Sequence, residues 1–306
     1  MKQIKVFSPA SVSNVCCGFD VLGFSVDGIG DELTISKSKK KKITITKISG
    51  FTVPSENNKN TASVAGQALL DHLGINEGFD IEINKKIKPG SGIGSSAASA
   101  VGAVFGINKL LGDPLKKEQL IQFAMMGEFV SSQSAPADNV ASALHGGLIL
   151  VNNHQNYEVV NLPAPKNLYA VVHHPLIEIK TSDSRVVLPQ NVDLETASNQ
   201  LSSIGGFIHS LHSLDFILMK SSLTDHLVEK YRAQHAPAFL EIKDTAMANG
   251  ALCCSISGSG PSIFCLIKGS SEADRIRTKI DKIYSRLGIK FNSYVTSLNA
   301  KGVHVI

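Results

Sequence analysis

The stretch Pro89-Gly90-Ser91-Gly92-Ile93-Gly94-Ser95-Ser96-Ala97-Ala98-Ser99 decides the fold. Its three glycines in five residues permit backbone conformations that a Cβ would forbid, and they let a ligand approach the main chain. Residues 97–111 carry small and then apolar side chains, which is typical of a helix. A Gly/Ser loop that leads into a helix presents N–H groups, hydroxyls and the positive end of the helix dipole. The stretch therefore predicts a phosphate site, although a plain glycine turn before a helix has the same composition.

The bulk composition is that of a globular protein with one large domain or two ordinary ones. The 306 residues are 43% hydrophobic and 18% charged, with a formal net charge of +4. This mild charge does not suggest a nucleic-acid partner, and the four lysines at 39–42 are interpreted as a solvated hairpin tip. No apolar run could span a membrane, so we expect a cytoplasmic protein without a membrane partner. The five cysteines show no Cys-x-x-Cys spacing, which indicates neither a zinc site nor disulfides.

Hydrophobic periodicity predicts both strands and helices along the whole chain. A linker at 162–165 separates the halves, and the second half predicts helices packed on an antiparallel sheet. The expected strands are 4–8, 32–38, 42–48, 79–83, 146–151, 168–173, 251–257, 263–267 and 291–297. The expected helices are 61–73, 97–111, one that starts at Asp113-Pro114 and includes Glu128, 194–219, 223–227 and 271–287.

Glu128 follows an apolar stripe on the helix expected after Pro114. It lies four residues after Ala124 and seven after Ile121, so it shares their side of the helix. A carboxylate on a buried face is costly unless it is paired or bound to a metal. The alternative is that the stripe has drifted by this turn and Glu128 is exposed. The residues alone leave both alternatives open.

Three ordered motifs resemble those of the GHMP kinases, and most closely those of their homoserine kinase branch. The stretch 89–99 is similar to the Gly-Leu-Gly-Ser-Ser-Ala phosphate loop, with Ile93 in place of Leu. The sequence Ser-Gly-Ser-Gly-Pro-Ser at 257–262 resembles the third motif, a glycine-rich loop packed against the phosphate loop. The first motif is matched in order by Pro9, Asn14, Gly18, Phe19 and Asp20. With Gly-Glu and Asp-Asn between these motifs, the resemblance covers nearly the whole chain.

The resemblance implies an α+β, two-domain GHMP kinase fold. A ribosomal-protein-S5-like α/β domain with the ATP loop is expected over 1–163, and a ferredoxin-like α+β sandwich over 164–306. The implied reaction uses ATP and Mg²⁺ to phosphorylate the side-chain hydroxyl of L-homoserine in threonine biosynthesis. Two alternatives stay open: another small alcohol, such as mevalonate, a sugar or a methylerythritol, and a non-catalytic GHMP module. Dimers are common among the relatives, which leaves a homodimer open.

The resemblance also implies which residues meet the nucleotide. Gly127-Glu128 matches the family's Gly-Glu, whose carboxylate binds Mg²⁺, and the Ser96 hydroxyl is expected as the second protein ligand of the metal. Asn139 is expected beside the transferring phosphate, so Asn139, Glu128 and Ser96 form the predicted catalytic set. The implied ATP-binding residues are Asn60, Lys88, Pro89, Gly90, Ser91, Gly92, Ile93, Gly94, Ser95 and Ser96. As a helix N-cap, Asn60 would need no nucleotide to explain it.

The implied substrate contacts come from four separate segments: Asn14, Asp20, Asp138, Arg185 and Arg232. Each arginine matches a family position, and a planar guanidinium suits the carboxylate of an amino acid. A surface position for Arg185 is an equal alternative. Where homoserine kinases have His-Ala-Asp-Asn, this chain has Pro136-Ala137-Asp138-Asn139. The missing His weakens the prediction of the substrate more than the prediction of a kinase.

Overall fold

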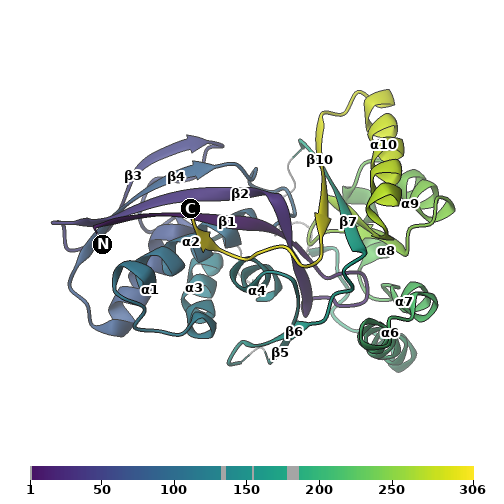
Figure 1. The fold of residues 1–306 in the computed structure, drawn as a ribbon, viewed down its shortest axis with the longest axis horizontal. Helices are drawn as coiled ribbons and strands as arrows, with labels where there is room; N and C mark the ends of the chain where they lie inside the picture. The colour runs from purple at the N-terminus through teal and green to yellow at the C-terminus, as the bar shows by residue number, and fades with distance from the viewer. Residues whose placement is uncertain (1, 132–135, 154, 178–185) are drawn as a thin grey trace.

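The chain forms two β-sheets with helices packed against them (Figure 1). The structure is a computed structural model, and it describes residues 2–131, 136–153, 155–177 and 186–306. The first sheet runs in the order β11-β1-β2-β4-β3, and β5 pairs with β2 and β6. Its strands are β1 (Gln3–Ser13), β2 (Leu22–Ser38), β3 (Ile43–Gly50), β4 (Gly78–Lys85), β5 (Leu148–Asn153), β6 (Glu158–Leu162) and β11 (His304–Val305).

Among the expectations for the first sheet, the end of its first strand and the hairpin are wrong. The strand expected to end at Ser8 continues through Pro9 to Ser13, because a bulge between Pro9 and Ala10 accommodates the proline against β2. The lysines at 39–42 are exposed, as expected, but they are not a hairpin tip. They connect β2 to β3, which lie on opposite sides of β4, and β3 pairs with β4 in parallel.

The helices of the first half lie together on one side of this sheet (Figure 1). Their apolar faces share one core with β1, β2 and β4, which includes Leu33, Ile35 and Val101. The helix expected from Pro114 begins later, because Asp113 adopts a left-handed conformation (φ 59°) and a 3₁₀ turn (Lys117–Leu120) comes first. The helices are α1 (Thr61–Leu73), α2 (Ser95–Leu110), α3 (Ile121–Ser131) and α4 (Asp138–His145).

The second sheet is antiparallel throughout, as expected, in the order β10-β7-β9-β8. With strands numbered along the chain this order is 4-1-3-2, the ferredoxin-like arrangement. The helix expected over 194–219 is two helices, because Leu214 turns left-handed (φ 58°) and Asp215 caps the second. The elements are β7 (Leu168–Pro175), α6 (Leu194–Ser213), α7 (Phe216–Ser222), α8 (Glu229–Arg232), a 3₁₀ turn (Ala233–His235), α9 (Phe239–Ala248), β8 (Cys253–Ile256), β9 (Ile263–Lys268), α10 (Ser270–Arg286) and β10 (Phe291–Ser297).

The two halves share a core, and the end of the chain returns from the second half to the first sheet. Phe24 of β2 meets Phe264 of β9 edge to face, with ring centroids 5.8 Å apart. The last strand, β11, returns to pair with β1. The boundary between 163 and 164 stays a prediction. All five cysteines are free and buried, and no helix within the described ranges is long and apolar enough to cross a membrane.

Candidate active site

The glycines of the loop before α2 all adopt positive φ angles: Gly90 67°, Gly92 80° and Gly94 69°. At two of these positions a side chain would also collide with neighbouring atoms. A Cβ at Gly92 would lie 2.6 Å from the carbonyl oxygen of Gly260, and a Cβ at Gly94 would lie 2.1 Å from Ser11 Oγ. The glycines therefore serve both backbone conformation and close packing. Residues 89–96 are called the phosphate loop below.

Serine hydroxyls from the third motif hold the carbonyls of the phosphate loop. Ser262 Oγ donates to the carbonyl of Ser91 at 2.6 Å, and Ser257 Oγ donates to the carbonyl of Gly92 at 2.7 Å. The N-cap of α2 is Gly94, which has no side chain to cap the helix. The N–H groups of the first turn thus remain for an anion, at the positive end of the helix dipole.

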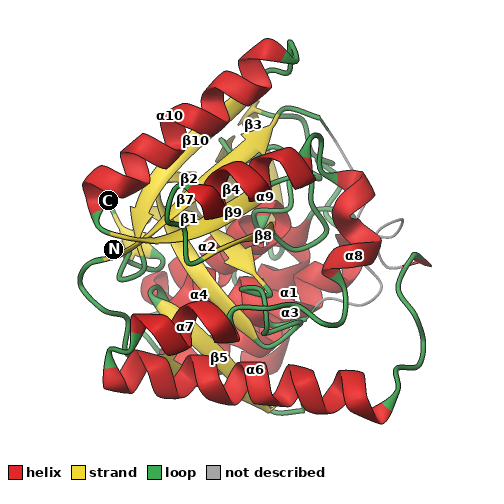
Figure 2. Ribbon diagram, turned by 90° about the vertical axis from the view of Figure 1, so that its right-hand side faces the viewer, coloured by secondary structure: helices red, strands yellow, loops and turns green. Residues whose placement is uncertain are grey.

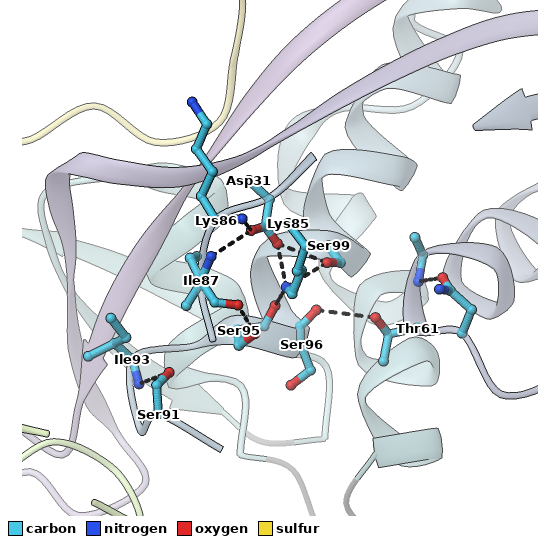
Figure 3. A network of polar contacts seen from close by, with 12 residues as sticks. Asp31, Thr61, Lys85, Lys86, Ile87, Ser91, Ile93, Ser95, Ser96 and Ser99 are labelled. Atoms are coloured by element: carbon cyan, nitrogen blue, oxygen red, sulfur yellow. Dashed lines mark hydrogen bonds and ion pairs between the residues drawn. The ribbon is translucent and has the colours of Figure 1, made fainter. Parts of the chain in front are cut away.

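A buried ion pair lies beneath the phosphate loop (Figure 3). The Lys85 ammonium pairs with the Asp31 carboxylate, and it also donates to the Ser95 carbonyl and, at 2.9 Å, to Ser99 Oγ. The other oxygen of Asp31 accepts the backbone N–H groups of the two residues after Lys85, at 3.0 and 3.1 Å. Both charged side chains are buried. This network fixes the end of β4 to the first turn of α2, and sequence reasoning missed it.

Glu128 is buried, which settles the alternative that the sequence left open. Ser96 Oγ donates to Glu128 Oε2 at 3.0 Å. Helix α3 can approach α1 closely because residue 127 is glycine. A Cβ at this position would lie 2.5 Å from the Thr61 carbonyl oxygen. Burial raises the pKa of Glu128 to about 7, against the opposing effects of the Ser96 hydrogen bond and the Lys85 charge. Such a carboxylate is stabilised by a cation.

This donor set suits magnesium. Carboxylate and hydroxyl oxygens are hard ligands, and Mg²⁺ keeps waters and phosphate oxygens for its other positions. Among the described residues there is no group of three or more His, Cys, Asp and Glu that could hold a metal by itself. A site with Glu128, Ser96 and nucleotide phosphates therefore fits Mg²⁺, which needs few protein ligands.

Asn139 lies against the phosphate loop at the start of α4. Its Oδ1 accepts a hydrogen bond from Ser11 Oγ at 2.8 Å, and its Nδ2 donates to Ser13 Oγ at 3.1 Å. An added Cβ on Gly94 would lie 3.1 Å from Asn139 Oδ1. The neighbouring Asp138 is fully buried, and its carboxylate accepts the N–H of Asn139 at 2.8 Å. Two strand serines thus orient the Asn139 amide at the phosphate loop.

The loop 14–20 and the third motif meet at Gly258. Asn14, itself left-handed (φ 72°), accepts the N–H of Asp20 on Oδ1 at 3.1 Å and donates from Nδ2 to the Gly258 carbonyl at 3.4 Å. Arg232 donates to the same carbonyl at 2.6 Å, and its guanidinium lies 5.4 Å from the centre of the Phe19 ring. Three of the predicted substrate residues therefore gather around one carbonyl and one loop.

The other predicted site residues have different surroundings. Asn60 caps α1: its Oδ1 accepts two backbone N–H groups of that helix, and its Nδ2 donates to the Pro54 carbonyl at 2.7 Å. Lys88 donates to the carbonyl of Leu176, just after β7, at 3.1 Å. The nucleotide contacts of Asn60 and Lys88 stay predictions. Arg185 lies outside the described residues, and its contact with substrate stays a prediction as well.

Comparison with known proteins assigns the chain to a family. The model of the GHMP kinases N-terminal domain matches residues 60–147, and that of the GHMP kinases C-terminal domain matches residues 207–286. A homoserine kinase of Chlorobium phaeobacteroides is 37% identical over 320 residues, with 100% of each chain covered. The chain belongs to the homoserine kinase family of GHMP kinases.

Solved structures agree with this family and its fold. A homoserine kinase from Cytophaga hutchinsonii is 45% identical with a TM-score of 0.96, covering 100% of this chain and 98% of that chain. The mevalonate kinase of L. major, bound to R-mevalonate, is 20% identical with a TM-score of 0.71, covering 97% of this chain and 96% of that chain. The second likeness shows a shared fold alone. The two-domain α+β GHMP kinase fold and the family resemblance expected from the motifs are confirmed.

The residues that sequence reasoning missed are those that hold the motifs in place. Ser11, Ser13, Ser257 and Ser262 are all buried, and their hydroxyls connect Asn139 and the phosphate loop to the strands and the third motif. The available signal was their position inside or beside the matched motifs. Composition alone did not distinguish them from ordinary loop serines.

Proposed function

We propose that this member of the homoserine kinase family transfers the γ-phosphoryl group of ATP to the side-chain hydroxyl of L-homoserine. The products are ADP and O-phospho-L-homoserine, on the route to threonine. The observation that carries the proposal is the convergence of three distant motifs: Ser11 contacts Asn139, and Asn14 and the phosphate loop both bond to the third motif. Full-length similarity to homoserine kinases supports the choice of acceptor.

The phosphate loop holds ATP through its backbone. The N–H groups at the start of α2 bind phosphate oxygens, and the helix dipole offsets part of their negative charge. Ser91 and Gly92 are bonded through their carbonyls to Ser262 and Ser257, so the loop keeps this shape before ATP arrives. A loop organised in advance loses little entropy when it binds the nucleotide.

Glu128 and Ser96 hold Mg²⁺ in this proposal. When bound, Mg²⁺ neutralises developing charge on the phosphate oxygens. Ionised Glu128 would supply the negative charge that attracts the cation, and Ser96 Oγ, which donates to Glu128 in the structure, would be the second protein ligand. The raised pKa of Glu128, caused by burial, means that the carboxylate ionises most favourably when a cation is present.

The acceptor lies between Asn139 and the loop 14–20 in this proposal. Asn139 donates toward the transferring phosphoryl group or the attacking hydroxyl, because its amide is fixed at the phosphate loop by Ser11 and Ser13. Asp20 and Asp138 supply carboxylates for an ammonium group, and Arg232 supplies a guanidinium for a carboxylate. A loose transition state needs little proton removal early in the reaction, so positioning and charge neutralisation suffice.

The test is ADP release by the purified full chain with MgATP and a panel of acceptors: homoserine, serine, threonine, mevalonate and galactose. We expect release that depends on homoserine and stops when Mg²⁺ is chelated. This result would also show that Pro136 is tolerated where relatives carry His. Release with another alcohol would support a kinase with a different acceptor. No release despite ATP binding would favour a non-catalytic module. We expect the reaction in the cytoplasm, where the free cysteines stay reduced.

A further inference from the structure

The buried side of helix α6 begins with polar residues. The helix lies at the edge of the molecule beside α7 (Figure 2), and its buried side chains are Gln200, Ser203, Phe207, Ser210 and Leu211. Phe207 and Leu211 belong to the apolar core. Gln200 is 5% exposed, and a buried carboxamide is costly unless its donor and its acceptor both find partners. The partners of Gln200 therefore indicate what this part of the helix does.

Gln200 joins two segments of the proposed substrate site. Its Nε2 donates to the carbonyl of Cys17, in the loop 14–20. Its Oε1 accepts the backbone N–H of His226 at 2.9 Å, in the segment that leads to Arg232. A carboxamide has a donor on one atom and an acceptor on the other, which neither a carboxylate nor an ammonium offers. One side chain thus holds both segments.

The loop 14–20 needs such support because part of its backbone is strained. Its residues 14–16 have successive φ angles of 72°, 41° and 57°. A left-handed backbone is disfavoured for residues other than glycine, and most of all for a β-branched residue such as Val15. Such a conformation persists where the surrounding structure holds it. The bond from Gln200 reaches the carbonyl of Cys17, the residue directly after this left-handed run.

The segment that leads to Arg232 has a second contact with α6. A hydrogen bond of 3.2 Å joins Ser203 Oγ to the ring Nε2 of His226. The carboxylate of Asp225 accepts the backbone N–H groups of residues 227–229 at 2.8, 2.8 and 3.1 Å. Helix α8 begins at the last of these residues and ends at Arg232. The position of His226 on α6 therefore sets where Arg232 lies.

We propose that Gln200 is a positioning residue for the acceptor amino acid, because its amide sets the spacing between the loop 14–20 and Arg232. Asp20 in this loop is proposed for the ammonium group, and Arg232 for the carboxylate. These two groups share one carbon atom of the amino acid, so their partners in the protein must also keep a fixed spacing. The inference rests on the proposed function for the identity of the acceptor, whereas the support of the loop does not depend on it.

The kinetic test is Gln200→Met in the full chain, because methionine keeps the length of the side chain and has no N–H. We expect the KM for homoserine to rise roughly 10-fold or more, while kcat and the KM for MgATP change less than about twofold. The matched control is Gln234→Met. Gln234 is exposed and donates to the Tyr231 carbonyl three residues away, so this variant should keep the wild-type KM. An unchanged KM for homoserine in Gln200→Met, or an equal rise for both substrates, would overturn the proposal.

Gln200→Glu separates the two hydrogen bonds of the amide. The new carboxyl group keeps an acceptor for the His226 N–H, but it donates to the Cys17 carbonyl only when it is protonated. Burial raises the pKa of a carboxyl group. The KM for homoserine, divided by the wild-type value, should therefore fall toward one from about pH 9 to about pH 6. Asp225 and His226 are present in both proteins, so the ratio removes the effect of their charges. A ratio that is constant over this range would count against the proposal.

Hydrogen exchange tests the positioning without any substrate. In Gln200→Met the amides of residues 14–20 and 225–232 should exchange faster than in the wild type, while those of α2 and β9 keep their rates. Unchanged exchange in both segments would overturn the proposal, whichever acceptor the enzyme uses. Faster exchange together with a wild type that releases no ADP with homoserine would refute the proposed function and support the positioning role.

Discussion

Replacing Glu128 with glutamine should stabilise the protein in the absence of divalent cations, although it removes a proposed metal ligand. The carboxylate is buried beside Ser96, and burial raises its pKa from 4.5 to about 7. The folded state therefore resists ionisation of this group. Glutamine keeps the shape and can accept the Ser96 hydrogen bond without a charge.

The pKa shift gives the size of the effect. A difference of about 2.5 units corresponds to roughly 3 kcal/mol, at 1.36 kcal/mol per unit. The folded pKa of Glu128 is raised, so its protonated form contributes this free energy to the stability of the wild type. The contribution is fully present below pH 4.5 and is lost as the pH rises to about 7. Above pH 7 the variant should be more stable than the wild type by roughly 3 kcal/mol, or about 5 °C in melting temperature.

The assay is thermal unfolding at pH 5 and pH 8 with a chelator present. The wild type should lose more stability between these values than Glu128→Gln. The matched control is Glu118→Gln, the same substitution at an exposed position, and its pH dependence should follow the wild type. Equal pH dependence in wild type and Glu128→Gln would refute the reasoning, as would a variant that melts lower at pH 8.

Three further predictions concern the same site. Below pH 7 the Mg²⁺ concentration for half-maximal activity should rise about tenfold per pH unit, because protons and the cation compete for Glu128; a constant value between pH 6 and 8 would contradict its role. Lys85→Met should lower the free energy of unfolding by about 3–5 kcal/mol, because it leaves the buried Asp31 carboxylate without its cation. Adding Asp31→Asn should recover part of this loss in urea unfolding, and no recovery would argue against the ion pair. Asn139→Ala should lower kcat roughly 100-fold while the KM for ATP changes little, so an unchanged kcat in steady-state assays would exclude a role in transfer.

Local signals predicted some elements to the residue. Helix α1 spans Thr61–Leu73 as expected, because Asn60 caps its start and the left-handed Gly74 ends it. Glycine at positions 90, 92 and 94 permits the positive φ angles that the structure shows there. Both cases depend on neighbours within a few residues, which a single sequence displays.

Long-range packing decided what the sequence left open. Glu128 is buried because Gly127 lets α3 approach the carbonyl of Thr61, 66 residues earlier in the chain. The pair of Lys85 and Asp31 joins residues 54 apart, and nothing near either one in sequence announces it. Such contacts follow from the way the helices and strands pack together. The hydrophobic periodicity of the sequence does not predict this packing.

The central claim, phosphoryl transfer to the side-chain oxygen of homoserine, is tested most directly by identifying the product. Phosphorus-31 NMR with proton correlation would follow the protein with MgATP and L-homoserine. The account predicts a phosphate monoester coupled to the terminal methylene of homoserine, formed in equal amount to ADP and absent with Glu128→Gln. ADP accompanied by inorganic phosphate alone, or phosphate attached to a different acceptor only, would contradict it.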